Sequence, residues 1–183
     1  MAMTIELLKK YLDSEQLKYF VDPNRPACML GMQGLCGRYQ FILALENNGT
    51  FLQCRTLYYL QCPPDHPNLA EVLKVLGAIN FKLRLVKFGW DPSDGEIMAY
   101  ADAMIMDGQI TQAQFNHMFR LFAMAVDMNF VRIGQAKDTG KDPGEIDPTT
   151  GGGLPPALRA LLKKITGHGP SGPTSDPGNL DSI

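Results

Sequence analysis

The Asn48-Gly49 pair, set between two alternating apolar segments, constrains this chain more than any other local feature. Both residues tolerate positive φ, so the pair favours the two-residue turn of a tight β-hairpin. Such a turn also sets the register, in which the numbers of paired residues sum to about 97. Leu43 then faces Cys54 on one nearly continuous apolar side of the hairpin. The outer side carries three further apolar residues, Phe51, Leu57 and Tyr59.

Segments on both sides of this hairpin extend it into an α+β arrangement. Apolar residues at helical spacing predict three helices, which begin near Thr4, Pro67 and Thr111 and end near Gln16, Asn80 and Asn129. Alternating residues predict strands besides the hairpin over residues 27–33, 81–88 and 96–104. The predicted order α-β-β-β-α-β-β-α corresponds to one antiparallel sheet packed by helices.

Composition divides the chain near residue 133. Residues 134–183 hold 10 Gly and 7 Pro and no Phe, Tyr or Trp, which predicts a flexible tail that cannot build a core. Residues 1–133 hold every aromatic residue and suffice for one domain. One part of the tail, near 155–166, has the spacing of a short amphipathic helix. Its apolar residues are Leu158, Leu161, Leu162 and Ile165.

The final predicted helix is apolar on two sides, so it needs two covers. Its main stripe faces the sheet. Its second stripe consists of Leu121, Met124 and Met128. Three covers for this stripe stay open: the first helix, a second subunit or client, and the tail helix. The tail helix either mimics a client on this surface or anchors a separate partner.

Charge and motifs exclude several classes of function. The chain carries 17 basic and 19 acidic residues without a Lys/Arg block, which argues against nucleic-acid binding. No apolar run approaches the roughly 18 residues of a membrane helix, and the N-terminus lacks a signal-peptide layout, so we expect a cytoplasmic protein that does not contact a membrane. The three histidines lie neither at metal-ligand spacing nor beside a nucleophile motif. We therefore expect no enzymatic activity and no cofactor.

The segment from Leu76 to Ile97 resembles the YbjN-like family. Members show a helix ending in Leu/Ile-Asn, a strand, and an Asp-x-x-Asp-Gly-Glu-Val/Ile hairpin; here Asn80 and the run Asp91-Pro-Ser-Asp-Gly-Glu-Ile match these motifs. The resemblance extends over about residues 4–130. It implies a fold similar to type III secretion chaperones and a non-enzymatic, often dimeric, protein-binding module with chaperone-like or regulatory roles. It implies no catalytic residues.

We therefore expect a protein-interaction module that captures an apolar or amphipathic segment of a partner protein. Its candidate contacts are the apolar residues left over once the core is built. They are Phe51, Leu57, Tyr59, Leu121, Met124, Met128, Leu158, Leu161, Leu162 and Ile165. The alternative is a structural or assembly subunit whose surplus apolar surface forms a permanent homodimer without a separate client.

The cysteines generate a first prediction. Cys28, Cys36, Cys54 and Cys62 have at least seven residues between neighbours, whereas zinc knuckles place about two to four residues between thiolates. We expect reduced structural thiols and less than one zinc ion per chain in protein purified without chelators. Elemental analysis measures this directly, and one tightly bound zinc per chain would contradict it.

Overall fold

The computed structural model describes residues 2–106, 108–145 and 160. Its helices are α1 (Ile5–Ser14), α2 (Leu69–Lys82) and α3 (Gln112–Thr139), with a short 3₁₀ helix η1 (Asn47–Gly49). Its strands are β1 (Phe20–Val21), β2 (Ala27–Gln33), β3 (Arg38–Glu46), β4 (Phe51–Leu57), β5 (Leu60–Gln61), β6 (Lys87–Trp90) and β7 (Glu96–Met104).

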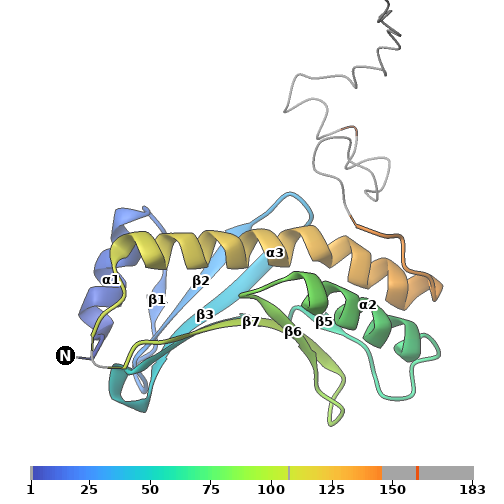
Figure 1. The fold of residues 1–183 in the computed structure, drawn as a ribbon, viewed down its shortest axis with the longest axis horizontal. Coiled ribbons are helices and arrows are strands. Elements are labelled where there is room, and N and C mark those ends of the chain that lie inside the picture. The colour runs from blue at the N-terminus through green and yellow to red at the C-terminus, as the bar shows by residue number, and fades with distance from the viewer. Residues whose placement is uncertain (1, 107, 146–159, 161–183) are drawn as a thin grey trace, which may run out of the picture.

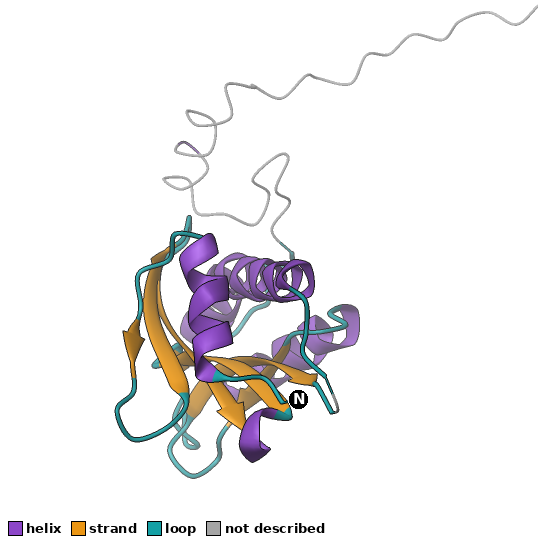
Figure 2. Cartoon of the chain, turned by 90° about the vertical axis from the view of Figure 1, so that its left-hand side faces the viewer, coloured by secondary structure: helices purple, strands orange, loops and turns teal. Residues whose placement is uncertain are grey.

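All strand pairs in this part of the chain are antiparallel. The order is β1-β2-β3-β4-β7-β5, and β6 pairs with β7. The three helices pack on one side of the sheet, which curves beneath them (Figures 1 and 2). The predicted α+β fold, one antiparallel sheet packed by helices, is confirmed. Two strands of two residues each, β1 and β5, add to the predicted order.

The core lies between the inner face of the sheet and α3. On β3, the Phe41 ring lies 5.2 Å from that of Phe122 and 6.1 Å from that of Phe119, centroid to centroid, both edge-on. On β7, the inner positions Ala99 and Ala101 are fully buried. Because these side chains are small, they leave room for the large rings of the helix. Small residues on one layer and aromatic residues on the other thus interlock.

The hairpin register is confirmed, since β3 and β4 pair from Gln40 with Leu57 through to Glu46 with Phe51. The loop is longer than predicted. Asn47, Asn48 and Gly49 all have positive φ, and together with residue 50 they form the turn. Gly49 is required there, because a Cβ atom on it would overlap with the carbonyl oxygen of Met3. A longer loop of even length leaves the register unchanged.

Tyr59 does not lie on the outer face of the hairpin, and that prediction was wrong. Tyr58 has φ of 53° and takes the chain out of the ladder after Leu57. The next residue therefore enters the core, where Tyr59 is 6% exposed. Its hydroxyl donates to the Val126 carbonyl at 2.7 Å, and burial raises its pKa well above the ordinary value.

The predicted strand over residues 81–88 was wrong in its first part. Helix α2 continues to Lys82, and pairing with β7 begins only at Lys87. The side chain of Asn80 donates to the Phe88 carbonyl and accepts from the Phe88 amide, both at 2.8 Å. These bonds attach the helix to the start of β6. Residues 83–86 therefore form a connection outside the sheet.

The final helix is also longer than predicted and runs across the division at residue 133. Its start is as expected, because Thr111 and Gln114 form a capping box. It continues to Thr139, since Ile133 and Ala136 are fully buried. Tertiary packing therefore extends the helix beyond the point where the composition changes.

Two adjacent tyrosines generate a prediction. Replacing Tyr59 by Ala should lower the free energy of unfolding by about 3–5 kcal/mol, because it leaves a cavity and removes a buried hydrogen bond. Tyr58, 87% exposed, is the matched control, and Tyr58→Ala should cost less than about 0.5 kcal/mol. Urea denaturation measures both values. Equal losses for the two variants would contradict the burial of Tyr59.

Candidate functional site

An apolar groove of about 380 Å³ lies between α3 and the connection 83–86. We call it the α3 groove. Its apolar lining consists of Leu83, Leu85, Val86, Leu121, Met124, Ala125 and Met128, and its polar edge of Lys82, Arg84 and Asn129. The second stripe predicted on the final helix, including Met124 at 57% exposure, is thus brought together here with residues from another part of the chain.

The wall of the groove opposite α3 is held by hydrogen bonds to its backbone. The Leu83 amide donates to the Ile79 carbonyl at 3.0 Å, which continues the last turn of α2. Lys87 Nζ donates to the carbonyls of Asn80 at 2.9 Å and Leu83 at 2.6 Å. A cation at these carbonyls also complements the negative end of the helix dipole. These bonds hold the start of the connection against the end of α2.

Positive charge lies at the edge of this groove. Lys82 and Arg84 are both exposed. Lys82 Nζ lies 2.5 Å from the Glu145 carboxylate, so this edge already accommodates one acidic group. Within residues 2–106 and 108–145, Arg84 makes no ion pair. The edge thus favours acidic groups in whatever lies in the groove.

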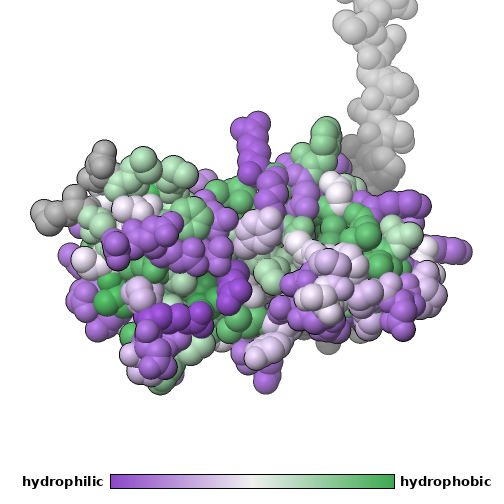
Figure 3. Space-filling model, turned by 90° about the horizontal axis from the view of Figure 1, so that it is seen from below, coloured by the Kyte–Doolittle hydropathy of each residue, from purple (hydrophilic) through white to green (hydrophobic). Residues whose placement is uncertain are grey.

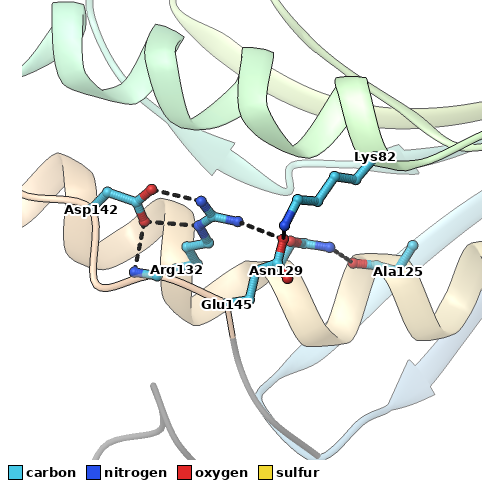
Figure 4. A network of polar contacts seen from close by, with 7 residues as sticks. Lys82, Ala125, Asn129, Arg132, Asp142 and Glu145 are labelled. Carbon is cyan, nitrogen blue, oxygen red and sulfur yellow. Dashed lines mark hydrogen bonds and ion pairs between the residues drawn. The ribbon is translucent and has the colours of Figure 1, made fainter.

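Residues 140–145, which we call the C-terminal strap, turn back along α3 after the helix ends at Thr139 (Figure 4). Arg132, 6% exposed, donates from Nε and Nη2 to the two carboxylate oxygens of Asp142, at 2.8 and 2.6 Å. The Gly144 amide also donates to Asp142 at 2.9 Å. The hydrogen bond from Arg132 holds the pKa of the Asp142 carboxyl below its usual value.

The strap ends beside the α3 groove. A second hollow of about 240 Å³ is lined by Ile79, Arg132 and Glu145 together with four residues of the groove. The shared residues are Lys82, Leu83, Met128 and Asn129. The chain at Glu145 therefore lies at one end of the groove.

The stripe of α3 that lines the groove lies between two covering helices. Near its start, α3 packs on α1, where the Tyr11 and Phe115 rings lie 5.5 Å apart. Near its end, α3 packs on α2, where Asn68 Nδ2 donates to the Lys137 carbonyl at 2.7 Å. These contacts are at Phe115 and Lys137 rather than at Leu121, Met124 or Met128, so they do not decide among the first helix, a second subunit or client, and the tail helix as the cover of the stripe.

Two predicted contact residues, Phe51 and Leu57, lie elsewhere. Both are half-buried on the outer face of β4, on the other side of the sheet from α3. Seen from below, the molecule shows hydrophobic and hydrophilic areas interleaved (Figure 3). The structure does not bring these residues to the α3 groove. Leu158, Leu161, Leu162 and Ile165 lie outside the described residues.

Sequence reasoning missed one wall of the groove and the strap. Leu83, Leu85 and Val86 were assigned to a strand because they belong to an alternating run. The signal available for the strap was Arg132, a charged residue in a largely apolar helix, followed by the acidic residues Asp142 and Glu145. A buried arginine requires a carboxylate partner, and the sequence offers Asp127 and Asp138 on the helix as well as Asp142 and Glu145 after Gly140.

The cysteines give no sign of a reactive or metal-binding site in the described part of the chain. Cys28, Cys54 and Cys62 are buried free thiols. Burial raises the pKa of Cys28, and burial together with Asp127 that of half-buried Cys36, to about 11 in each case. These thiols are therefore protonated near neutral pH. No group of three His, Cys, Asp or Glu residues among the described ones is placed to hold a metal ion.

Comparison with known proteins identifies the class. The family model YbjN, "Putative bacterial sensory transduction regulator", matches residues 4–135. The chain belongs to the YbjN family. A comparison of the sequence with curated proteins found no match.

None of the helices in the described part of the chain combines the length and apolar character needed to span a membrane.

Solved structures that are similar to this one include the following two. The crystal structure of YbjN from E. coli has 17% sequence identity and a TM-score of 0.56, and the alignment covers 76% of this chain and 95% of that chain. The structure of the HopA1-SchA chaperone-effector complex has 16% identity and a TM-score of 0.42, with coverage of 66% and 88%. The first similarity extends over nearly the whole of E. coli YbjN and shows a shared fold.

The strap generates a prediction. Asp142→Asn should lower the free energy of unfolding at pH 7 by about 1–3 kcal/mol, because it leaves the buried Arg132 guanidinium with only the more distant Glu145 carboxylate, 3.7 Å from Nη1. Asp138→Asn is the matched control, because Asp138 pairs with Lys137 at the surface, and it should cost less than about 0.5 kcal/mol. Urea denaturation measures both.

The difference in free energy of unfolding between the native chain and Asp142→Asn depends on pH. The folded-state pKa of Asp142 is lowered, so its contribution is present above the unfolded-state value near 3.8 and is lost as pH falls through the folded-state pKa. The difference between the native chain and Asp142→Asn should therefore shrink as pH falls from 5 toward about 3. A difference that stays constant over this range would contradict the assignment.

Proposed function

We propose that this protein is a non-enzymatic interaction module that binds an amphipathic, acidic segment of a partner protein in the α3 groove, in a chaperone-like or regulatory role. The observation that carries the proposal is the groove itself, where Met124 is 57% exposed among apolar neighbours. An apolar hollow at the surface favours a ligand that buries apolar groups there. Membership of the YbjN family supports a regulatory context.

A helical ligand suits the shape of this surface. Leu121, Met124 and Met128 are spaced three and four residues apart on α3, so they extend over about two turns, or roughly 10 Å. A partner helix has the same spacing, so residues at i, i+3, i+4 and i+7 can meet this stripe. Because the connection 83–86 is already held in place, the conformational entropy lost on binding is mainly that of the ligand.

Charge specifies the ligand further. Exposed Lys82 and Arg84 at the edge of the groove favour acidic residues beside the apolar ones. The Glu145 carboxylate beside Lys82 illustrates this contact within the chain itself. Edge charges of this kind mainly raise the association rate and select the partner, while the apolar contacts provide most of the affinity.

The alternative function, a permanent homodimer, is favoured by a different surface. On the outer face of the sheet, Phe51 pairs with Met104, which is 72% exposed. Apolar residues paired across two strands could be covered by a second copy. Sedimentation distinguishes the two functions: a stable dimer that Met104→Glu dissociates would support this alternative.

A defined peptide tests the groove. The probe is a fluorescein-labelled 16-residue helical peptide with Leu at i, i+3, i+4 and i+7 and Glu at the flanking positions. Met124→Glu should weaken its binding by about tenfold or more, because a carboxylate must then be desolvated in the groove and repels the Glu side chains of the peptide. Fluorescence anisotropy measures the dissociation constants.

Met104→Glu is the matched control, since Met104 is also an exposed methionine, at 72%, and lies on the other side of the sheet. It should leave peptide binding unchanged. A peptide with Lys in place of Glu should bind about 3- to 10-fold more weakly. The proposal fails if a scrambled peptide of the same composition binds equally well, or if the two methionine variants behave alike.

A further inference from the structure

The last described residues of the strap position the rest of the chain beside the α3 groove. Gly140 has φ of 68°, which reverses the chain at the end of α3. The Arg132–Asp142 pair then holds the strap against α3, and Glu145 pairs with Lys82 at the edge of the groove. Residues that follow Glu145 therefore start within side-chain distance of the lining residues Lys82 and Met128.

Those residues include the apolar set predicted from sequence spacing. Eight residues, 146–153, separate Glu145 from Leu154, and a chain of that length spans at most about 28 Å. The stripe on α3 extends over roughly 10 Å. Reach therefore permits Leu158, Leu161, Leu162 and Ile165 to meet the groove. These four residues have the i, i+3, i+4, i+7 spacing that the proposed partner would have.

Charge distinguishes this segment from an acidic partner. Arg159, Lys163 and Lys164 are basic. On a helix Lys163 lies opposite the four apolar residues, while Arg159 and Lys164 flank them at the positions where an acidic ligand would carry Glu. Docking by the apolar side therefore forms no ion pairs with Lys82 and Arg84, so the contact should be weaker than that of an acidic ligand.

We propose that residues 154–165 of the same chain occupy the α3 groove when no partner is bound and are displaced by an acidic amphipathic partner. The competition with a partner rests on the function proposed above. A tethered segment has an effective concentration in the millimolar range, so even weak docking lowers the apparent affinity for a competing ligand. If the dissociation constant of the docked segment is a few times below that effective concentration, the apparent affinity for the competing ligand falls by about 3- to 10-fold.

Methionine methyl signals in the full-length chain test the docking. Met124 and Met128 line the groove, whereas Met104 and Met106 are exposed elsewhere and act as internal controls. Samples labelled with ¹³C at the methionine methyl groups give one signal each, and Met→Leu replacements assign them. The double substitution Leu158→Ser with Leu162→Ser should shift the two groove signals and leave the two control signals unchanged.

The matched control is Arg159→Gln with Lys163→Gln, which changes the polar side of the same segment and should leave the groove signals in place. Unchanged groove signals in the Leu158→Ser, Leu162→Ser chain would overturn the proposal. Shifts that depend on protein concentration, together with a dimeric mass by sedimentation, would assign the segment to a second copy and would also overturn it.

Peptide binding separates this inference from the proposed function. The Leu158→Ser, Leu162→Ser chain should bind the acidic amphipathic peptide about 3- to 10-fold more tightly than the native chain. Shifted methyl signals with unchanged peptide affinity would overturn the competition. If the native and the doubly substituted chains bind the peptide equally well and the groove signals do not shift, the docking is overturned and the proposed function stands. Shifted signals without peptide binding to either chain would support the docking and refute the partner.

Discussion

The length of α3 relative to its neighbours determines the arrangement of this molecule. At 28 residues, the helix is about 42 Å long, so no single neighbouring helix covers it. Helix α1 packs near its start, while α2, with 14 residues, packs near its end. Because α2 stops at Lys82 and the chain leaves it through residues 83–86, one stripe of α3 faces a connection rather than a helix. The groove is a consequence of this mismatch in length.

A single carboxylate connects the same helix to the far side of the fold. Asp127 accepts hydrogen bonds at 2.8 Å from the amides of Leu35 and Cys36 and from the hydroxyl of Tyr39. Two amides of the turn between β2 and β3 and one hydroxyl of β3 thus converge on one residue of α3. The preceding residue of α3, Val126, accepts a hydrogen bond from the Tyr59 hydroxyl through its carbonyl. These bonds fix the rotation of the helix about its axis, so they also fix which stripe faces the groove.

Local chemistry made part of this structure predictable. A two-residue turn at Asn48-Gly49 and the observed four-residue loop 47–50 have the same centre, so both give the same register, and the pairing of β3 with β4 could be predicted from sequence although the loop length could not. Where tertiary contacts decide, the pattern was insufficient. Tyr58 adopts positive φ and rotates Tyr59 into the core, and Asn80 binds β6 through its side chain rather than ending α2. The α3 wall of the groove could be predicted from the helical spacing of its apolar residues. The opposite wall, residues 83–86, could not, because it depends on where α2 ends.

An exposed apolar groove carries a cost in selectivity, because any apolar segment can enter it. Two features restrict which segments can bind here: the cations Lys82 and Arg84, and the connection 83–86, which is held by hydrogen bonds. Both belong to the wall opposite α3. Apolar contacts along α3 favour every amphipathic helix to a similar extent, so discrimination depends on the charges that the opposite wall places beside it. A basic helix and an acidic helix of equal apolar content should therefore differ in affinity through that wall alone. The same wall also receives Glu145, so the acidic partner and the end of the strap compete for Lys82.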